Sequence, residues 1–302
     1  MRKVTLLLCL YSLFSYAQQE SFLTNFIYQM SLINPAYAGA EGNNTVAFTT
    51  RNQWVSIENS PKTQVMTFSS ERGKNIGLGL SFISNNFFVE RNTASYVDVS
   101  YRLKVSENSA LFLGLKAGAT FFKANLFGLT SLGAELDPAQ NAFSRANPNL
   151  GIGTLFQASS FWFSISIPRL FNSSDTFEFS KTSTDRIHTY LGSGLTFSLN
   201  ETLFLKPSFL IRSVSNLGTT ADFVALISIK NNLNFGASYR TNNSLGFLAT
   251  VSLADYVAIG YAYETPMDSG LSALKINTHE IVLQFSFGQK STASSQPNEV
   301  DE

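Results

Sequence analysis

The chain has 302 residues, of which 14% are charged and 27 are phenylalanine, and its 21 basic residues balance its 21 acidic ones. A soluble domain usually carries roughly 25% charged residues, so the low charge disfavours an ordinary soluble domain. A nucleic-acid-binding domain carries a basic excess, and the balanced charge gives no indication of one. A mean hydropathy of +0.04 in a Phe-rich chain without long apolar runs is typical of a transmembrane β-barrel.

Residues 1–17 are predicted to be a secretory signal peptide. Two basic residues precede an apolar run from Val4 to Phe14, and Ser15-Tyr16-Ala17 places small residues at both cleavage-recognition positions. A signal anchor is the less favoured alternative, because the run is shorter than the roughly 20 residues of a transmembrane helix. Cleavage after Ala17 removes Cys9, the single cysteine, and with it any disulfide, cysteine metal ligand or cysteine nucleophile.

Residues 18–42 precede the first predicted strand. Their apolar stretch, Phe22 to Ile33, has no period of two, so we expect a short helical or irregular segment in the barrel lumen or against its periplasmic rim. Pro35 restricts Asn34 to extended backbone, and Gly39 supplies flexibility where the chain enters the barrel. Asn34-Pro35 is either a structural turn that seats the segment, which we favour, or part of a luminal plug or docking element. The two roles are compatible.

From residue 43 to residue 288, apolar and polar residues alternate with a period of two, which predicts β-strands. Fourteen segments show the pattern: Asn43–Arg51, Lys62–Ser70, Asn75–Ser84, Ala94–Val105, Ser109–Phe122, Asn149–Ala158, Phe161–Ile167, Ile187–Leu199, Thr202–Ser213, Thr220–Lys230, Leu233–Thr241, Ser244–Leu253, Tyr256–Glu264 and His279–Gly288. Backbone amides in hydrocarbon must all be hydrogen-bonded, which a closed barrel achieves. The predicted fold is therefore an all-β, transmembrane antiparallel barrel of about 14 strands.

The connections between these strands alternate in length. Tight polar turns are predicted at Glu71-Arg72-Gly73, Glu107-Asn108, Ser159-Ser160, Asn200-Glu201, Asn231-Asn232 and Ala254-Asp255. The other end carries longer connections, Asn52–Pro61, Asn85–Arg91, Lys123–Pro148, Pro168–Arg186 and Thr265–Lys275, with Val214–Thr219 and Asn242-Asn243 as shorter exceptions. Short periplasmic turns and long extracellular loops are typical of outer-membrane barrels. This arrangement predicts both chain termini on the periplasmic side.

Charged residues of the strands share the face opposite the apolar one. They are Asp98, Arg102, Lys116, Lys206, Arg212, Asp222, Arg240, Glu264 and Glu280. A Lys or Arg facing lipid at the bilayer midplane costs about 2–4 kcal/mol, so we predict that this set lines the lumen. Six aromatic residues are candidates for the interfacial girdles: Trp54, Trp162, Tyr101, Tyr190, Tyr261 and Tyr263.

The C-terminal end carries a possible assembly signal. The last predicted strand ends near Phe287, and a terminal strand ending in phenylalanine suits recognition by the barrel-assembly machinery. Residues 289–302 form a Ser-rich, then acidic tail that we expect to be disordered. The tail weakens the case for Phe287, because such signals usually end the chain.

The sequence resembles the PorP/SprF family of the type IX secretion system. The resemblance begins at Leu32-Ile33-Asn34-Pro35-Ala36-Tyr37-Ala38-Gly39 and continues in order through Arg51-Asn52-Gln53-Trp54, Gly77-Leu78-Gly79, Gly114-Leu115-Lys116-Ala117-Gly118, Pro148-Asn149-Leu150-Gly151-Ile152-Gly153, Phe235-Gly236-Ala237-Ser238-Tyr239-Arg240, Ile259-Gly260-Tyr261-Ala262-Tyr263-Glu264 and His279-Glu280-Ile281. We take as signature residues Asn34, Pro35, Tyr37, Gly39, Arg51, Trp54, Tyr261, Tyr263, His279 and Glu280.

The resemblance implies an outer-membrane barrel that supports export, surface anchoring or motility of a secreted adhesin through protein–protein contact. Implied partners are an adhesin with a type IX C-terminal secretion domain, secretion components on the periplasmic side, and outer-membrane lipid. An SprF-like, adhesin-dedicated paralogue is favoured over a PorP-like one, because such paralogues are the numerous kind.

Catalysis is not expected. The two histidines, His188 and His279, are too few to indicate a metal site in a chain with no cysteine in its mature part. No Gly-x-Ser-x-Gly elbow of a serine hydrolase is present. Gly151-Ile152-Gly153 and Gly192-Ser193-Gly194 lack the third glycine and the strand–loop–helix context of a nucleotide loop, so no cofactor is expected. An outer-membrane pore or transporter for small solutes remains the main alternative function, and a soluble secreted β protein is a third.

Overall fold

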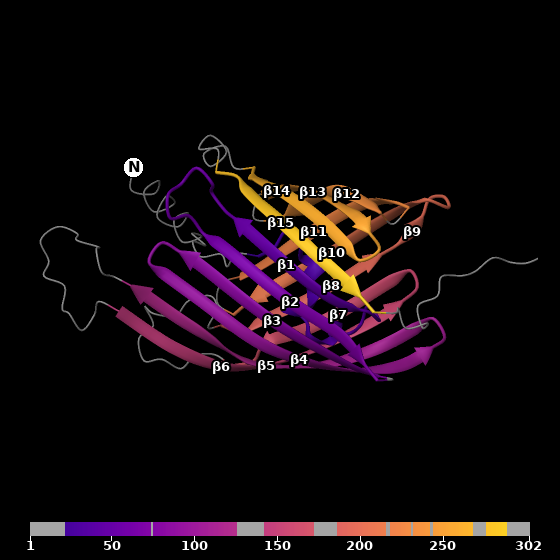
Figure 1. Ribbon diagram of the computed structural model, residues 1–302, viewed down its shortest axis with the longest axis horizontal. Coiled ribbons are helices and arrows are strands. Elements are labelled where there is room, and N and C mark those ends of the chain that lie inside the picture. The colour runs from indigo at the N-terminus through magenta and orange to yellow at the C-terminus, as the bar shows by residue number, and fades with distance from the viewer. Residues whose placement is uncertain are drawn as a thin grey trace, which may run out of the picture.

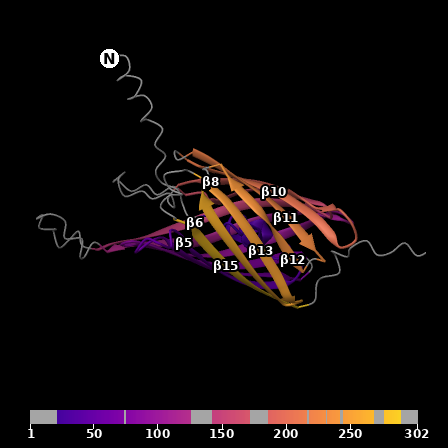
Figure 2. The same cartoon turned by 90° about the horizontal axis from the view of Figure 1, so that it is seen from above.

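The computed structural model describes residues 22–73, 75–125, 142–171, 186–215, 218–230, 232–241, 244–267 and 276–288. These residues form a closed antiparallel β-barrel of 14 strands, tilted around the barrel wall (Figures 1 and 2). Consecutive strands pair with each other, and the last pairs with the first from Asn44–Phe287 to Asn52–His279. The predicted fold is confirmed, whereas the predicted signal peptide and tail lie outside the described residues.

The strands are β1 (Asn44–Asn52), β2 (Lys62–Arg72), β3 (Ile76–Phe87), β4 (Glu90–Ser106), β5 (Ser109–Asn125), β6 (Ala142–Ala158), β7 (Phe161–Arg169), β8 (His188–Leu195), β9 (Phe197–Ser198), β10 (Leu203–Val214), β11 (Gly218–Ile229), β12 (Leu233–Arg240), β13 (Ser244–Ala254), β14 (Val257–Pro266) and β15 (Thr278–Phe287). Both β8 and β9 pair with β10, so they act as one barrel strand interrupted at Thr196. Among the described residues, no helix is long and apolar enough to cross a membrane.

Four neighbouring strands are longer than predicted at the extracellular end. Strands β3 and β4 pair as far as Phe87 and Glu90, so the long connection predicted over Asn85–Arg91 is wrong and only a Phe88-Val89 turn remains. Strands β4, β5 and β6 have 17 residues each, more than the roughly 9–11 needed to cross a bilayer. Where a strand rises above the membrane both faces meet water, and the apolar alternation used to predict its length ends.

The two faces of the barrel wall differ as expected for a membrane-spanning barrel. On β3 the outward side chains of Leu78, Leu80 and Phe82 are exposed, while Gly77, Gly79 and Ser81 face inward. Tyr101 and Tyr261 also point outward.

The prediction is wrong for two of the six residues expected in the interfacial girdles. Trp162 packs edge-on against Tyr37 inside the barrel, with 6.2 Å between ring centroids. Tyr190 is buried against Phe22, at 6.1 Å. Both rings contact the chain segment that precedes β1.

Candidate functional site

The lumen is occupied by residues 22–42, which we call the plug. It contains two short 3₁₀ segments, η2 (Phe26–Leu32), kinked at Gln29, and η3 (Pro35–Tyr37). Asn34, Ala36 and Ala38 are at most 1% exposed, so the barrel wall surrounds this part of the chain.

The plug runs from the extracellular end of the barrel to the periplasmic end. Phe22 lies against Arg212, near the β10 end that leads to an extracellular connection, with 5.2 Å from the guanidinium carbon to the ring centroid. The Gly39 amide donates to Ser69 Oγ, at 2.8 Å, close to the short β2–β3 turn. A 3₁₀ segment rises about 2 Å per residue, so a stretch of this length suffices to cross the lumen once. The first described residues therefore lie at the extracellular end of the lumen, whereas the chain terminus, predicted on the periplasmic side, lies outside the described residues.

An ion-pair network holds the extracellular half of the plug. It consists of Asp222, Arg240, Glu264, Arg51 and Glu280, which lie on β11, β12, β14, β1 and β15. The guanidinium of Arg51 contacts Glu264 at 3.1 Å and Glu280 at 3.2 Å. That of Arg240 contacts Asp222 at 2.5 Å and Glu264 at 3.2 Å.

The plug backbone completes this network. The amides of Thr24 and Asn25 donate to the two carboxylate oxygens of Glu280, at 2.9 and 2.7 Å. The Thr24 hydroxyl donates to Glu264 Oε2 at 2.6 Å and accepts from Arg51 at 2.8 Å. Charge-assisted hydrogen bonds are the strong class, so the network fixes where the plug begins.

A second ion pair holds the middle of the plug. Lys116 Nζ lies 2.7 Å from Asp98 Oδ1 and donates to the backbone carbonyl of Ser31 at 3.0 Å. It also lies over the Tyr96 ring, 5.1 Å from the centroid. Lys116 and Asp98 are almost fully buried, so this lysine joins the plug to two strands at once.

The periplasmic half of the plug lies in a cradle of glycines. A Cβ added to Gly114 would overlap backbone atoms of Pro35 and Ala36, one at Gly153 would overlap the Asn34 side chain, and one at Gly77 would overlap the Ala38 carbonyl. These glycines come from β5, β6 and β3. Their missing side chains leave the space that the Asn34–Ala38 segment fills.

Polar contacts fix the segment in the cradle. Asn34 accepts from the Ala36 amide through Oδ1 and donates through Nδ2 to the Thr154 carbonyl, both at 2.9 Å. Ser166 Oγ donates to the Ile33 carbonyl at 2.6 Å, and Ser100 Oγ donates to the Ala38 carbonyl at 2.5 Å. Asn34 thus acts both as a turn former and as a cross-link to the wall.

We expect Ser166→Ala to lower the free energy of unfolding by about 1–2 kcal/mol, because it leaves the buried Ile33 carbonyl without its hydrogen bond. Urea unfolding in lipid vesicles measures the change. Ser208→Ala is the matched control, since the buried Ser208 Oγ has no hydrogen-bond partner in the described structure, and it should change stability by less than about 0.5 kcal/mol. Equal losses in the two variants would contradict the assigned role of Ser166.

An apolar cluster in the lumen was missed by the sequence analysis. Phe26 and Met30 of the plug belong to one buried cluster with Leu210, Val224, Leu226 and Leu248 of β10, β11 and β13. The signal was present: Phe223 to Ile227 is apolar on both faces of its strand. Such a strand is buried on both sides, so the inner face needed an apolar partner, and the Phe22–Ile33 stretch supplies it.

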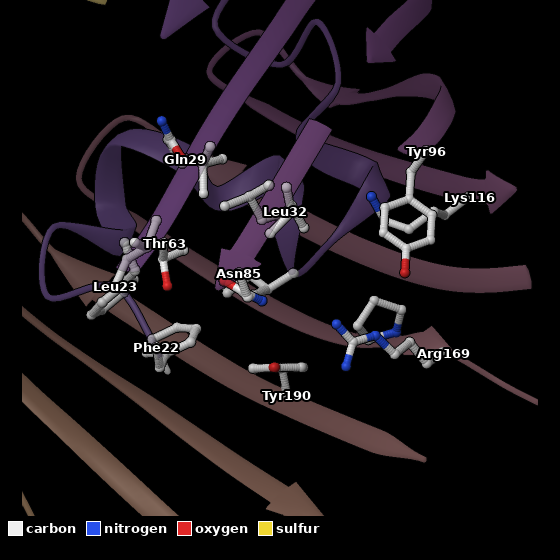
Figure 3. Close-up of a pocket in the computed structure, with 15 residues that line it drawn as sticks. Phe22, Leu23, Gln29, Leu32, Thr63, Asn85, Tyr96, Lys116, Arg169 and Tyr190 are labelled. Carbon is white, nitrogen blue, oxygen red and sulfur yellow. The ribbon is translucent and has the colours of Figure 1, made fainter. Parts of the chain in front are cut away.

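A cavity of about 70 Å³ lies beside the plug, as Figure 3 shows. Phe22, Leu23 and Gln29 of the plug face Asn85, Tyr96 and Tyr190 of the wall across it (Figure 3). It is large enough for a few water molecules, whereas an aqueous channel through the barrel is much wider.

The structure brings most of the predicted site residues to the plug. Asn34, Pro35, Tyr37 and Gly39 belong to it, and Arg51, Asp98, Lys116, Asp222, Arg240, Glu264 and Glu280 bind it or support it. Of the other predicted luminal charges, Lys206 donates to Ser228 and Arg102 lies 3.8 Å from Glu71, while Arg212 donates to Thr220 and also contacts Phe22 of the plug.

Five predicted site residues lie away from the plug. Tyr261 and Tyr263 flank His279 on the outer face, with the Tyr261 hydroxyl 2.6 Å from His279 Nδ1. Trp54 lies in the extracellular β1–β2 loop, against Phe87. Phe287 is exposed on the outer face at the periplasmic end of β15, and its role in assembly stays a prediction.

Among the described residues, no group of three or more His, Cys, Asp or Glu side chains is suited to a metal ion. His188 is fully buried, stacked on Tyr190 at 6.2 Å and 3.4 Å from Arg169. The chemistry at the lumen is thus that of ion pairs, backbone hydrogen bonds and close packing around the plug.

Comparisons with known proteins agree with this architecture. Residues 15–285 match the family described as type IX secretion system membrane protein PorP/SprF. No protein of curated function matches the chain in sequence.

Among solved structures, the CymD monoaromatic hydrocarbon channel is 11% identical, with a TM-score of 0.51 over 87% of this chain and 94% of that one. The outer membrane protein Omp33 of Acinetobacter baumannii is also 11% identical, with a TM-score of 0.49 over 82% of this chain and all of that one. The likeness to CymD is a likeness of fold alone.

Proposed function

Since the chain belongs to the PorP/SprF family of type IX secretion system outer-membrane barrels, we propose that it supports export, surface anchoring or motility of a secreted adhesin by protein–protein contact, without catalysing a reaction. The proposed partners are an adhesin with a type IX C-terminal secretion domain and secretion components on the periplasmic side. Within the family we propose the SprF-like, adhesin-dedicated role.

The filled lumen is the observation that favours this role over a solute pore. Charged side chains at two levels of the lumen, Arg51 with Glu280 and Lys116 with Asp98, are at most 2% exposed and are engaged by the plug. A pore for small solutes needs a continuous aqueous path lined by accessible groups. A barrel whose lumen is filled has its two ends left as surfaces for other proteins.

Deletion of the gene tests the proposal. We expect surface display of a large secreted protein encoded beside it to fall below detection by surface proteolysis and mass spectrometry, with solute uptake unchanged. Complementation with the intact gene is the control. Display that persists at the parental level in the deletion strain would overturn the secretion role.

Conductance separates the two candidate functions independently. The purified intact barrel should show no steady conductance in planar lipid bilayers, because the plug closes the lumen. A steady open level in the intact protein would favour the pore.

A further inference from the structure

Exposed apolar side chains gather at the extracellular end of the barrel, where β1–β2 and β3–β4 are connected. Val55 and Ile57 in the β1–β2 loop, and Phe87 and Phe88 at the β3–β4 turn, are between 46% and 60% exposed. Trp54 packs edge-on against Phe87, with 6.3 Å between ring centroids. We call these five residues the extracellular apolar patch.

The patch is a fixed structure. The Phe88 amide donates to the Asn59 carbonyl at 3.1 Å, which joins the turn to the loop. Within the loop, the Ile57 amide donates to the Trp54 carbonyl at 2.8 Å and that of Gln53 to the Pro61 carbonyl at 3.0 Å. The Val55 amide reaches the Asn277 carbonyl at 3.3 Å, before β15. The backbone that carries the apolar side chains is thus held by hydrogen bonds within the chain.

The backbone of the patch is strained. Of the four non-glycine residues with positive φ in the described chain, two belong to the patch, Trp54 at 52° and Phe88 at 54°, and a third, Asn59 at 57°, lies in the same loop as Trp54. For bulky residues this conformation is a true outlier, and such outliers cluster where a protein binds or acts. The strained backbone holds large apolar side chains in exposed positions.

Lipid does not account for the patch. At the level of Phe87, the neighbouring outward positions are Lys62, Asn86 and Arg91, which pair in register across β2, β3 and β4. The lipid-facing belt on β3 ends with Phe82, about 17 Å along the strand from Phe87 at roughly 3.4 Å per residue. The patch therefore lies above the hydrocarbon, where an exposed apolar cluster marks a protein contact.

From this placement we propose that the extracellular apolar patch is the docking surface for the exported protein, which contacts it through an apolar segment of its own. The inference rests on the proposed secretion role and deepens it by locating the contact. Aromatic side chains at the centre of a contact supply most of its binding energy, so Trp54, Phe87 and Phe88 should dominate.

A triple variant, Val55→Thr, Ile57→Thr and Phe88→Asn, tests the proposal. Asparagine tolerates positive φ better than phenylalanine, so the turn keeps its backbone while the patch loses three of its five apolar side chains and keeps Trp54 and Phe87. We expect display of the protein that is lost in the deletion strain to fall at least about tenfold, with heat-modifiable migration of the barrel unchanged. The control, Leu253→Thr with Tyr256→Asn, removes exposed apolar side chains at the periplasmic end and should leave display unchanged.

Photo-crosslinking from position 88 identifies the occupant. A p-benzoylphenylalanine in place of Phe88 should form an adduct with the protein that is lost from the surface in the deletion strain. An adduct with lipid or with a second copy of this chain, or normal display in the triple variant, would overturn the docking surface. Loss of display in the deletion strain together with normal display in the triple variant rejects the patch alone, and the secretion role survives.

Discussion

Replacing Gly114 with alanine is expected to displace the Asn34–Tyr37 part of the plug and open the barrel to ions. The new Cβ would overlap the backbone of Pro35 and Ala36, which a side-chain rotation cannot relieve. Overpacking of this kind costs about 1–3 kcal/mol. Applied to the closed state alone, that cost raises the population of open barrels by about 5- to 150-fold. Single-channel recording in planar bilayers, or ion efflux from vesicles, measures the opening.

Leu115→Ala is the matched control, because the neighbouring side chain on β5 faces lipid and does not touch the plug. This variant should show no steady conductance in the bilayer, like the intact protein. If Gly114→Ala folds, shown by heat-modifiable migration, and still conducts nothing, the glycine cradle is not what seats the plug.

Replacing Glu280 with glutamine is expected to be the most destabilising single change in the ion-pair network. The substitution keeps the shape of the side chain and removes the charge that faces Arg51 and the amides of Thr24 and Asn25. Breaking one partner of a buried ion pair costs about 3–5 kcal/mol, because the other charge stays buried. Urea unfolding in lipid vesicles should show a loss of this size.

Glu71→Gln provides the comparison. Its contact with Arg102 is longer, at 3.8 Å, and both side chains are partly exposed, so the loss should be no more than about 1 kcal/mol. A loss in Glu280→Gln that is no larger than in Glu71→Gln would refute the anchoring role of Glu280.

The sequence was informative about the barrel because lipid imposes a strict alternation on the strands. It was less informative where that constraint is absent. Strands β3 to β6 continue above the membrane without an apolar face, so Asn85 to Arg91 looked like a loop although it pairs in register. Pro148 lies within β6, opposite Ala119, where it had been taken for the end of a connection.

The luminal ion pairs show a different limit. Asp98 and Lys116, Asp222 and Arg240, and Arg51 and Glu280 are direct cross-strand neighbours. The period of two places each side chain on the inner face. It does not say which charges lie opposite each other, because that depends on the register between the strands and so on the loop lengths.

Predicting the plug required more information than the strands or the ion pairs. Its apolar stretch and the two-sided apolar strand at Phe223 to Ile227 are each visible in the sequence, yet nothing local says that they meet. The direction of the plug was not predicted, because the rule for barrel termini concerns the strands and not a segment that runs through the lumen.

The meeting of β1 and β15 has a consequence for biogenesis. Arg51 and Glu280 lie on the two strands whose pairing closes the cylinder, and the Thr24 and Asn25 amides are bound to Glu280 at the extracellular end. The contact that holds the extracellular end of the plug is therefore made at the seam where the first and last strands meet. Glu280 is bound both by Arg51 of the opposite closing strand and by the plug amides, so closure of the barrel and seating of the plug depend on the same carboxylate. The plug that fills the finished barrel is thus bound to the strand pair that closes it.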